Sequence, residues 1–350
     1  MSFKIIVTLV LTLAFSICYT GALAAEQLQV VATTSDIASI TRAIGGDRVA
    51  VQSLNDGTRD PHFLQAQPTY IVQARNADLF IRIGMELEVG YEPVILDASR
   101  NARIAVGKQG HLDLSANVVK LEVPTQKVDR SMGDVHAMGN PHYWLDPYNG
   151  RIMAWDIAGQ LSRLDPEGTA IYAKNLAGFN RRLDEAMFGV QALEAIGGDR
   201  LWVALLQGEL ERLLQEKQIV AGGWFGLLAP FKGQGVISQH RSWNYLLNRF
   251  GLKLTAEMEP KPGIPPGPQH LMDVVETVRR ENVKVIMVEP FYGTTAADYV
   301  ASRTGAQVIV CANATGGTPE ATDYLGMLDH AIRSLAGVLG AQPPINPVRP

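Results

Sequence analysis

The stretch LQVVATTSDIASITRAIGG, residues 28–46, predicts the fold class of the chain. Residues 28–34 are mostly apolar or β-branched, as in a buried strand, and residues 35–46 carry apolar side chains at helical spacing before two glycines. A second strand at residues 49–54 follows, and then a helix at 68–75 and a strand at 78–83. This alternation of strands and helices predicts an α/β lobe with a parallel sheet.

The same alternation returns in the second half of the chain. We expect strands at residues 201–206, 235–238, 252–258, 284–288 and 307–311, and helices at 243–250, 269–281 and 321–339. Between the two halves, residues 149–198 have helical spacing that is broken at Asp165-Pro166. A helix of about 30 residues after that break would be about 45 Å long, which predicts a connecting helix. A helix packed inside one domain has the same periodicity and stays an alternative.

The N-terminal segment predicts export. Lys4 precedes an apolar run over residues 5–17, and a small-x-small cleavage pattern ends at Ala24. We therefore expect residues 1–24 to be a signal peptide and the mature protein to be periplasmic. Cys18 offers an alternative in which a lipid anchors the protein, but a large residue precedes it where a small one is wanted.

Composition narrows the range of functions. The chain has 31 Lys and Arg against 35 Asp and Glu, a net charge of −4, and no concentrated basic stripe. Nucleic acid is therefore not an expected partner, because phosphate binding requires such a stripe. If Cys18 leaves with the signal peptide, Cys311 is the only cysteine left, so the mature fold depends on its core instead of a disulfide.

These patterns together predict a layout of five segments. They are a signal peptide at 1–24, an N-terminal α/β lobe at 25–148, a connecting helical region at 149–198, a C-terminal α/β lobe at 199–340 and a disordered proline-rich tail at 341–350. We expect the mature protein to be a monomer.

Three histidines stand in loops beside predicted elements and are candidate metal ligands. They are His62 in DPHFLQ, His142 in NPHYWLDP and His240 in SQHRSWNYLLNRFGL. Zinc favours imidazole nitrogen and commonly takes four ligands. Loops from distant segments can meet at the carboxyl ends of parallel strands, although spacing alone does not show that these three meet.

The sequence resembles the periplasmic zinc and manganese solute-binding proteins of ABC transporters. The resemblance is carried by residues 30–62, by NPHYWLDP, by NRFGL after His240, and by MEPKPGIPPGPQHL and VEPFYGTTAADYVASRTGAQV. It implies two α/β lobes joined by one long rigid helix, with a metal ion held in the cleft between the lobes. The positions that match the family's histidine ligands are His62, His142 and His240.

The chain departs from this family at the fourth ligand. Members often place an aspartate after the last strand of the second lobe, where this chain reads VIVCANATGG and has Ala312 near the expected position. The alternatives are Glu289 from VEPFY, a water molecule or a residue of a loop. We expect His136 to be a solvated loop histidine and Cys311 to be a buried structural thiol.

The resemblance implies a protein that is not an enzyme. It would capture zinc and pass it to the membrane permease of an ABC importer, and manganese is the alternative ion. A manganese-binding protein or an adhesin of the same fold would share the site. A zinc hydrolase with Glu289 as base is a further alternative, but no HExxH helix is present.

Overall fold

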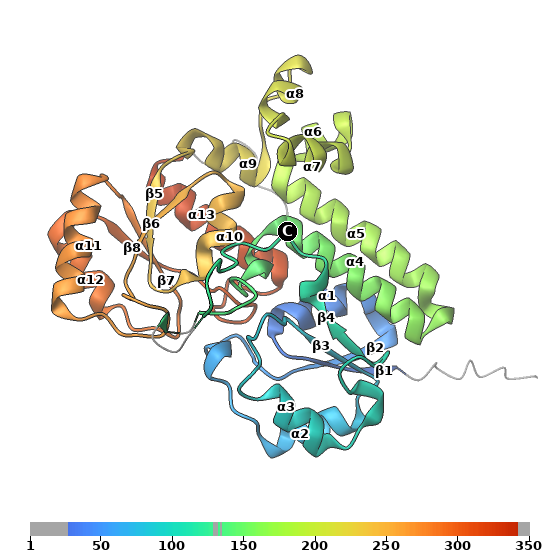
Figure 1. Ribbon diagram of the computed structural model, residues 1–350. Helices are drawn as coiled ribbons and strands as arrows, with labels where there is room; N and C mark the ends of the chain where they lie inside the picture. The colour runs from blue at the N-terminus through green and yellow to red at the C-terminus, as the bar shows by residue number, and fades with distance from the viewer. Residues whose placement is uncertain (1–26, 129–131, 134, 342–350) are drawn as a thin grey trace, which may run out of the picture.

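The computed structural model describes residues 27–128, 132–133 and 135–341. It contains two four-stranded parallel sheets, each covered by helices (Figure 1), which confirms the predicted α/β class with two lobes. The predicted signal peptide with Cys18 and the tail from residue 342 lie outside the described residues. In the part of the chain that is described, no helix is both long enough and apolar enough to span a bilayer.

The first lobe is built on a sheet with the strand order β2-β1-β3-β4. Its elements are β1 (Leu28–Ala32), α1 (Ser35–Gly45), β2 (Val49–Ser53), α2 (Pro68–Asn76), β3 (Leu79–Arg82), α3 (Glu92–Ser99) and β4 (His111–Asp113). Successive side chains of a strand point to opposite faces, so Val30 packs in the core that includes α1 whereas Val31 packs with α2 and α3. Both faces of the sheet are therefore buried.

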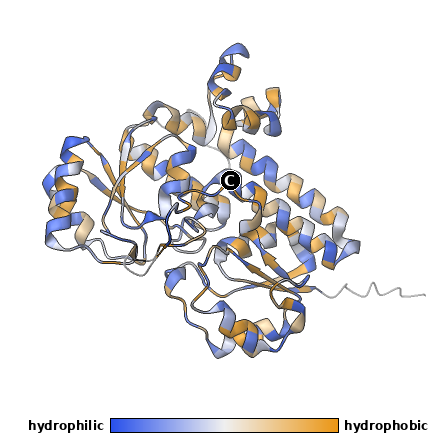
Figure 2. Ribbon diagram, viewed as in Figure 1, coloured by the Kyte–Doolittle hydropathy of each residue, from blue (hydrophilic) through white to orange (hydrophobic). Residues whose placement is uncertain are grey.

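The second lobe repeats this topology with the strand order β6-β5-β7-β8. Its elements are β5 (Gly235–Ser238), α10 (Asn244–Arg249), β6 (Lys253–Glu257), α11 (Pro268–Arg280), β7 (Val285–Val288), α12 (Thr295–Thr304), β8 (Gln307–Val310) and α13 (Tyr324–Leu339). Met287 packs in the core with α10 and α13, and its neighbour Ile286 packs with α11 and α12. The two central strands, β5 and β7, are buried at every position, and β7 is apolar throughout (Figure 2), as is typical of parallel strands covered on both faces.

Two helices that connect the lobes in the sequence, α4 (Pro147–Leu164) and α5 (Thr169–Phe188), lie side by side (Figure 1). The 20 residues of α5 give it a length of about 30 Å, and it contacts both α1 and α9 (Gly223–Leu228), which precedes β5. A long connecting helix is present, but the prediction that it continues through residue 193 is wrong. It stops because Gly189 has a φ of 80°, outside the helical region.

The prediction of a strand at residues 201–206 is also wrong, because this segment belongs to α7 (Gly198–Leu206). It is flanked by α6 (Val190–Ile196) and α8 (Leu210–Glu216). The run LWVALL is short and apolar, so its periodicity does not distinguish a buried strand from a helix. Leucine and alanine favour the helix, and Asp199 in the first turn stabilises its N-terminus.

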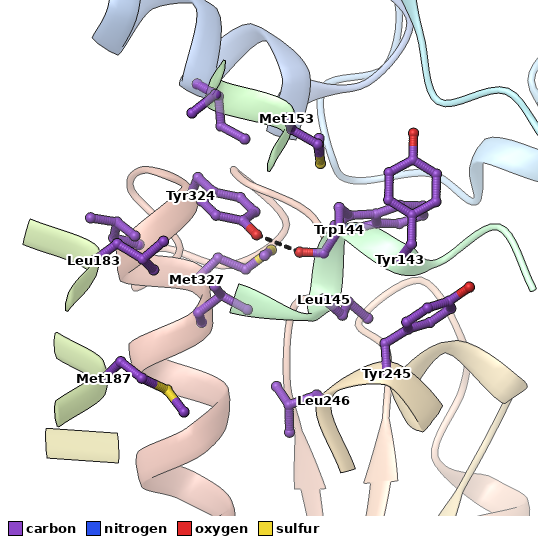
Figure 3. Close-up of a cluster of buried hydrophobic side chains, with 14 of the residues drawn as sticks. Tyr143, Trp144, Leu145, Met153, Leu183, Met187, Tyr245, Leu246, Tyr324 and Met327 are labelled. Carbon is purple, nitrogen blue, oxygen red and sulfur yellow. Dashed lines mark hydrogen bonds between the residues drawn. The ribbon is translucent and has the colours of Figure 1, made fainter. Parts of the chain in front are cut away.

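One hydrophobic core extends across both lobes (Figure 3). Tyr143, Trp144 and Leu145 lie at its centre and contact side chains from α4, α5, α10 and α13. The Tyr324 hydroxyl donates a hydrogen bond of 2.6 Å to the backbone oxygen of Trp144. This core fixes the loop before α4 against the second lobe, and that loop carries His142.

Candidate metal centre

His62, His142 and His240 form a compact group, which we call the three-histidine cluster. One ring nitrogen from each lies within 4.8 Å of those of the other two. The ring centroids are 5.0 Å apart for His62 and His142, 5.3 Å for His62 and His240, and 5.2 Å for His142 and His240. The structure therefore brings together three residues that are separated by 80 and 98 positions in the sequence.

Two of these rings are held by the same local motif. In DPH, Asp60 Oδ1 accepts hydrogen bonds from the backbone N–H of His62, at 2.9 Å, and from its ring Nδ1, at 2.8 Å. In NPH, Asn140 Oδ1 accepts the same two bonds from His142, also at 2.9 and 2.8 Å. A proton on Nδ1 leaves the Nε2 lone pair as the one that can bind a metal.

The amide of Asn140 has a defined orientation because its nitrogen is committed elsewhere. Asn140 Nδ2 donates to Glu122 Oε2 at 2.7 Å and to the backbone oxygen of Arg241 at 2.9 Å. Only Oδ1 is then left to face His142. This network therefore fixes the tautomer of His142 through its direct hydrogen bond to Asn140.

His240 is held through the register of the second sheet. Strand β5 lies between β6 and β7, and Ser238 pairs with Glu257 on one side and with Met287 on the other. Two residues further along each strand, His240 therefore lies between Glu259 and Glu289. Glu259 Oε2 accepts a hydrogen bond from His240 Nδ1 at 2.8 Å. We call Asp60, Asn140 and Glu259 the orienting residues.

The electrostatics of the cluster follow from burial and from these carboxylates. Burial, reinforced by the neighbouring imidazoles, lowers the pKa of His142 well below its usual value, so its ring stays neutral. Burial also lowers the pKa of His240, but the hydrogen bond and charge of Glu259 outweigh it and the pKa rises overall. Burial would raise the pKa of Asp60, yet its interactions with His62 lower it to about 2, so this carboxylate is ionised.

Glu289 lies at the end of β7 and is completely buried. Burial raises its pKa to about 7, and the nearby His240 opposes this rise. The structure does not bring Glu289 into the compact group formed by the three histidines.

His136 differs from its prediction as a solvated loop histidine. Its half-buried ring lies with its centroid 5.3 Å from that of His62, and its charge contributes to the lowered pKa of His142. With His142 and His240 it lines a cavity of about 40 Å³, enough for an ion or one or two waters. The loop is held nearby, because the backbone N–H of Ala137 donates to Glu86 Oε2 at 2.7 Å.

The segment where the family's aspartate was expected serves to join the lobes. Trp144 Nε1 donates to the backbone oxygen of Asn313 at 2.7 Å, and Thr315 donates through its backbone nitrogen and its hydroxyl to Asp36 Oδ1. Ala312 is buried, and its side chain has no atom that can bind a metal. Cys311 is buried as predicted, and burial raises the pKa of its thiol to about 12.

Two parallel α/β lobes with a buried histidine cluster at their junction are the architecture of a metal-binding solute-binding protein. The model of the family described as the periplasmic component A of the zinc-uptake complex, ZnuA, matches residues 30–196 and 213–338. The chain belongs to this family of zinc and manganese solute-binding proteins. The match leaves out residues 197–212, which include α7 and the start of α8.

The curated relatives bind different metals according to their names. A manganese ABC transporter substrate-binding lipoprotein, PsaA of Streptococcus anginosus, is 32% identical over 177 residues, 49% of this chain and 54% of that protein. An iron ABC transporter substrate-binding lipoprotein, MtsA of Streptococcus pyogenes serotype M1, is 31% identical over 161 residues, 46% of this chain and 49% of that protein. The chain thus spans about half the length of the curated relatives that it matches.

The solved structures agree on the fold over nearly the whole chain. A crystal structure of ZnuA superposes with a TM-score of 0.65 at 22% identity, covering 89% of this chain and 99% of that one. This level of identity establishes the shared fold, and the choice of metal has to be argued from the residues of the site.

Proposed function

We propose that this protein captures one zinc ion outside the cytoplasm and delivers it to the permease of an ABC importer. The three-histidine cluster carries this proposal, because each ring is held through Nδ1 in a position that leaves Nε2 for a metal. The names of PsaA and MtsA support the transport role for proteins of this kind. Their description as lipoproteins and the predicted signal peptide both favour export, either as a free protein or anchored through Cys18.

The donor set favours zinc over manganese. Imidazole nitrogen suits borderline metals such as zinc, whereas manganese is better matched by carboxylate and water oxygens. Three imidazoles already provide most of the four-coordinate shell that zinc prefers. A manganese role is the alternative, and it would require oxygen donors that the three-histidine cluster does not contain.

A hydrolytic zinc centre needs space for a substrate next to the metal. The cavity beside His142 and His240 measures about 40 Å³, whereas small-molecule sites are usually about 300–1,000 Å³. The function as a capture protein is therefore better supported than that of an enzyme. An adhesin of the same fold would share the metal site, so transport is tested in cells by growth under zinc limitation.

The binding test compares five purified proteins, each prepared without added metal. They are the wild type, H62A, H142A and H240A, with H330A as the matched control because His330 lies on α13 away from the cluster. We expect one zinc per wild-type chain, and a loss of affinity of more than about 100-fold in each cluster variant but not in the control. Unchanged zinc binding in all three cluster variants would refute the assignment.

The metal preference is measured by competition. Wild-type protein loaded with manganese should release it when an equimolar amount of zinc is added, and a protein that keeps manganese would contradict the proposed cargo.

The fourth position has two candidate protein ligands in the described part of the chain, Glu289 and His136. E289Q tests the first, because loss of a ligand should exceed the roughly 10- to 100-fold effect of changing a residue that only supports one.

A further inference from the structure

We propose that His136 is the fourth protein ligand, supplied by the loop before α4 when the metal binds. This inference rests on the proposed function. It assigns the fourth position to a loop histidine of the first lobe instead of a carboxylate of the second lobe, and so completes an all-imidazole shell.

The spacing of the rings is the first argument. A nitrogen about 2.1 Å from zinc, with its ring centroid about 1.1 Å further out, places the centroids of two tetrahedral imidazole ligands about 5.2 Å apart. The three-histidine cluster has centroid separations of 5.0, 5.3 and 5.2 Å. His136 lies 5.3 Å from His62 and therefore already has ligand spacing to one member of the cluster.

The position of the ring relative to the cavity is the second argument. His136 lines the same small cavity as His142 and His240. Its nitrogens lie outside the compact group, so ligation requires the ring to move inward. Rotation of a side chain on a loop is sufficient for such a movement, and Ala137 and Gly139 hold the adjoining backbone in place through bonds to Glu86 and to the His136 carbonyl.

The position of the rival ligand is the third argument. Glu289 is fully buried and lies outside the compact group formed by the three histidines, so its carboxylate would have to leave that buried position to reach the metal. His136 already lines the cavity beside the cluster. An all-imidazole shell also keeps the site selective for zinc, because no oxygen donor is introduced.

The test uses zinc alone and counts the ligands directly. X-ray absorption at the zinc edge should show four imidazoles in the wild type and three in H136A, with one zinc per chain in both. Zinc affinity should fall by more than about 100-fold in H136A, because the loss of a ligand exceeds the roughly 10- to 100-fold effect of changing a residue that only supports one. H330A is the matched control and should keep four imidazoles.

A second variant shows whether a loss of zinc affinity in H136A comes from the loss of a ligand. H136D offers an oxygen donor at the same place and should retain manganese better than H136A, which a residue outside the metal shell would not cause. Three imidazoles in wild type and H136A alike, or two zinc ions in the wild type and one in H136A, would overturn the inference. If E289Q lost a zinc ligand and H136A did not, the fourth ligand would be Glu289. A wild type that takes up no zinc would instead refute the proposed function.

Discussion

Asp60, Asn140 and Glu259 do not touch the proposed metal, yet each decides which nitrogen of its histidine faces the cavity. Hydrogen bonds of 2.8 Å from Nδ1 hold all three rings. Such supporting residues also raise the basicity of the ligand and limit its rotation. Their replacement should therefore weaken metal binding without removing a ligand.

Asp60 provides the first prediction. D60A should weaken zinc binding by about 10- to 100-fold, because His62 loses both the acceptor of its Nδ1 proton and the anchor of its backbone. The measurement is a competition titration with a chelator. D56A is the control, since Asp56 lies in the same loop but its side chain accepts from Thr58 and not from a histidine. Equal affinities for the two variants would contradict the role of Asp60.

Asn140 cannot be exchanged for the aspartate found in the equivalent DPH motif. Its Nδ2 donates to Glu122 and to the Arg241 carbonyl, so a carboxylate there would face two acceptors. We expect N140D to lower the free energy of unfolding by about 1–3 kcal/mol. Adding E122Q, which supplies a donor, should recover part of this loss in urea denaturation, and a double variant no better than N140D would disprove the explanation.

The sequence indicates the proposed ligands more readily than the residues that orient them. His62 and His142 stand in short motifs whose orienting residue is two positions away, so the local pattern indicates both. Glu259 is 19 residues from His240, and only the pairing of β5 with β6 reveals their contact. The sequence does not single out His136, because a single histidine in a polar loop carries no signal until the loop is placed against His62.

Helix α7 is a whole element whose type cannot be predicted from its own sequence. Trp202 is buried, its ring lies 4.9 Å from that of Phe188, and its Nε1 donates to Asp184 Oδ1 at 2.6 Å. These contacts join α7 to α5, and they require a helix so that Trp202 and Leu201 meet the core while Val203 remains exposed. Local apolar periodicity could not anticipate this, because the partner residues lie in another element.

Trp202 is thus the residue that holds α7 against α5. W202A should lower the free energy of unfolding by about 3–5 kcal/mol, through lost burial and a cavity next to Phe188. V203A changes the adjacent exposed side chain and should have an effect within about 0.5 kcal/mol. Urea denaturation of both variants measures the difference. Similar values would show that α7 is held by something other than this tryptophan.

At the scale of the whole molecule, the lobes are joined by buried polar contacts as well as by the shared core. Asp36 at the start of α1 in the first lobe accepts both hydrogen bonds of Thr315 in the second. Burial raises the pKa of Asp36 to about 6, although these bonds lower it in part. The junction between the lobes therefore contains a carboxyl group that prefers to be neutral.

This preference makes part of the stability depend on pH. The folded protein holds the proton of Asp36 more tightly than the unfolded chain, so the stabilisation is complete below about pH 3.8 and is lost as the pH rises through about 6. Between pH 7 and pH 4.5 the wild type should gain about 2 kcal/mol relative to D36N. D47N removes an exposed carboxylate and should show no such difference. Parallel pH profiles for wild type and D36N would refute this assignment.

The orienting residues also have a consequence for the valence of the cargo. Two of them, Asp60 and Glu259, are carboxylates behind imidazole rings, so the proposed dication would balance their two negative charges. A monovalent ion would leave one negative charge there and a trivalent ion one positive charge, and uncompensated charge is costly away from water. The protein would then sort ions by charge before it distinguishes them by chemistry. In D60N the balance shifts by one unit, so silver(I) should compete with zinc more strongly than it does in the wild type.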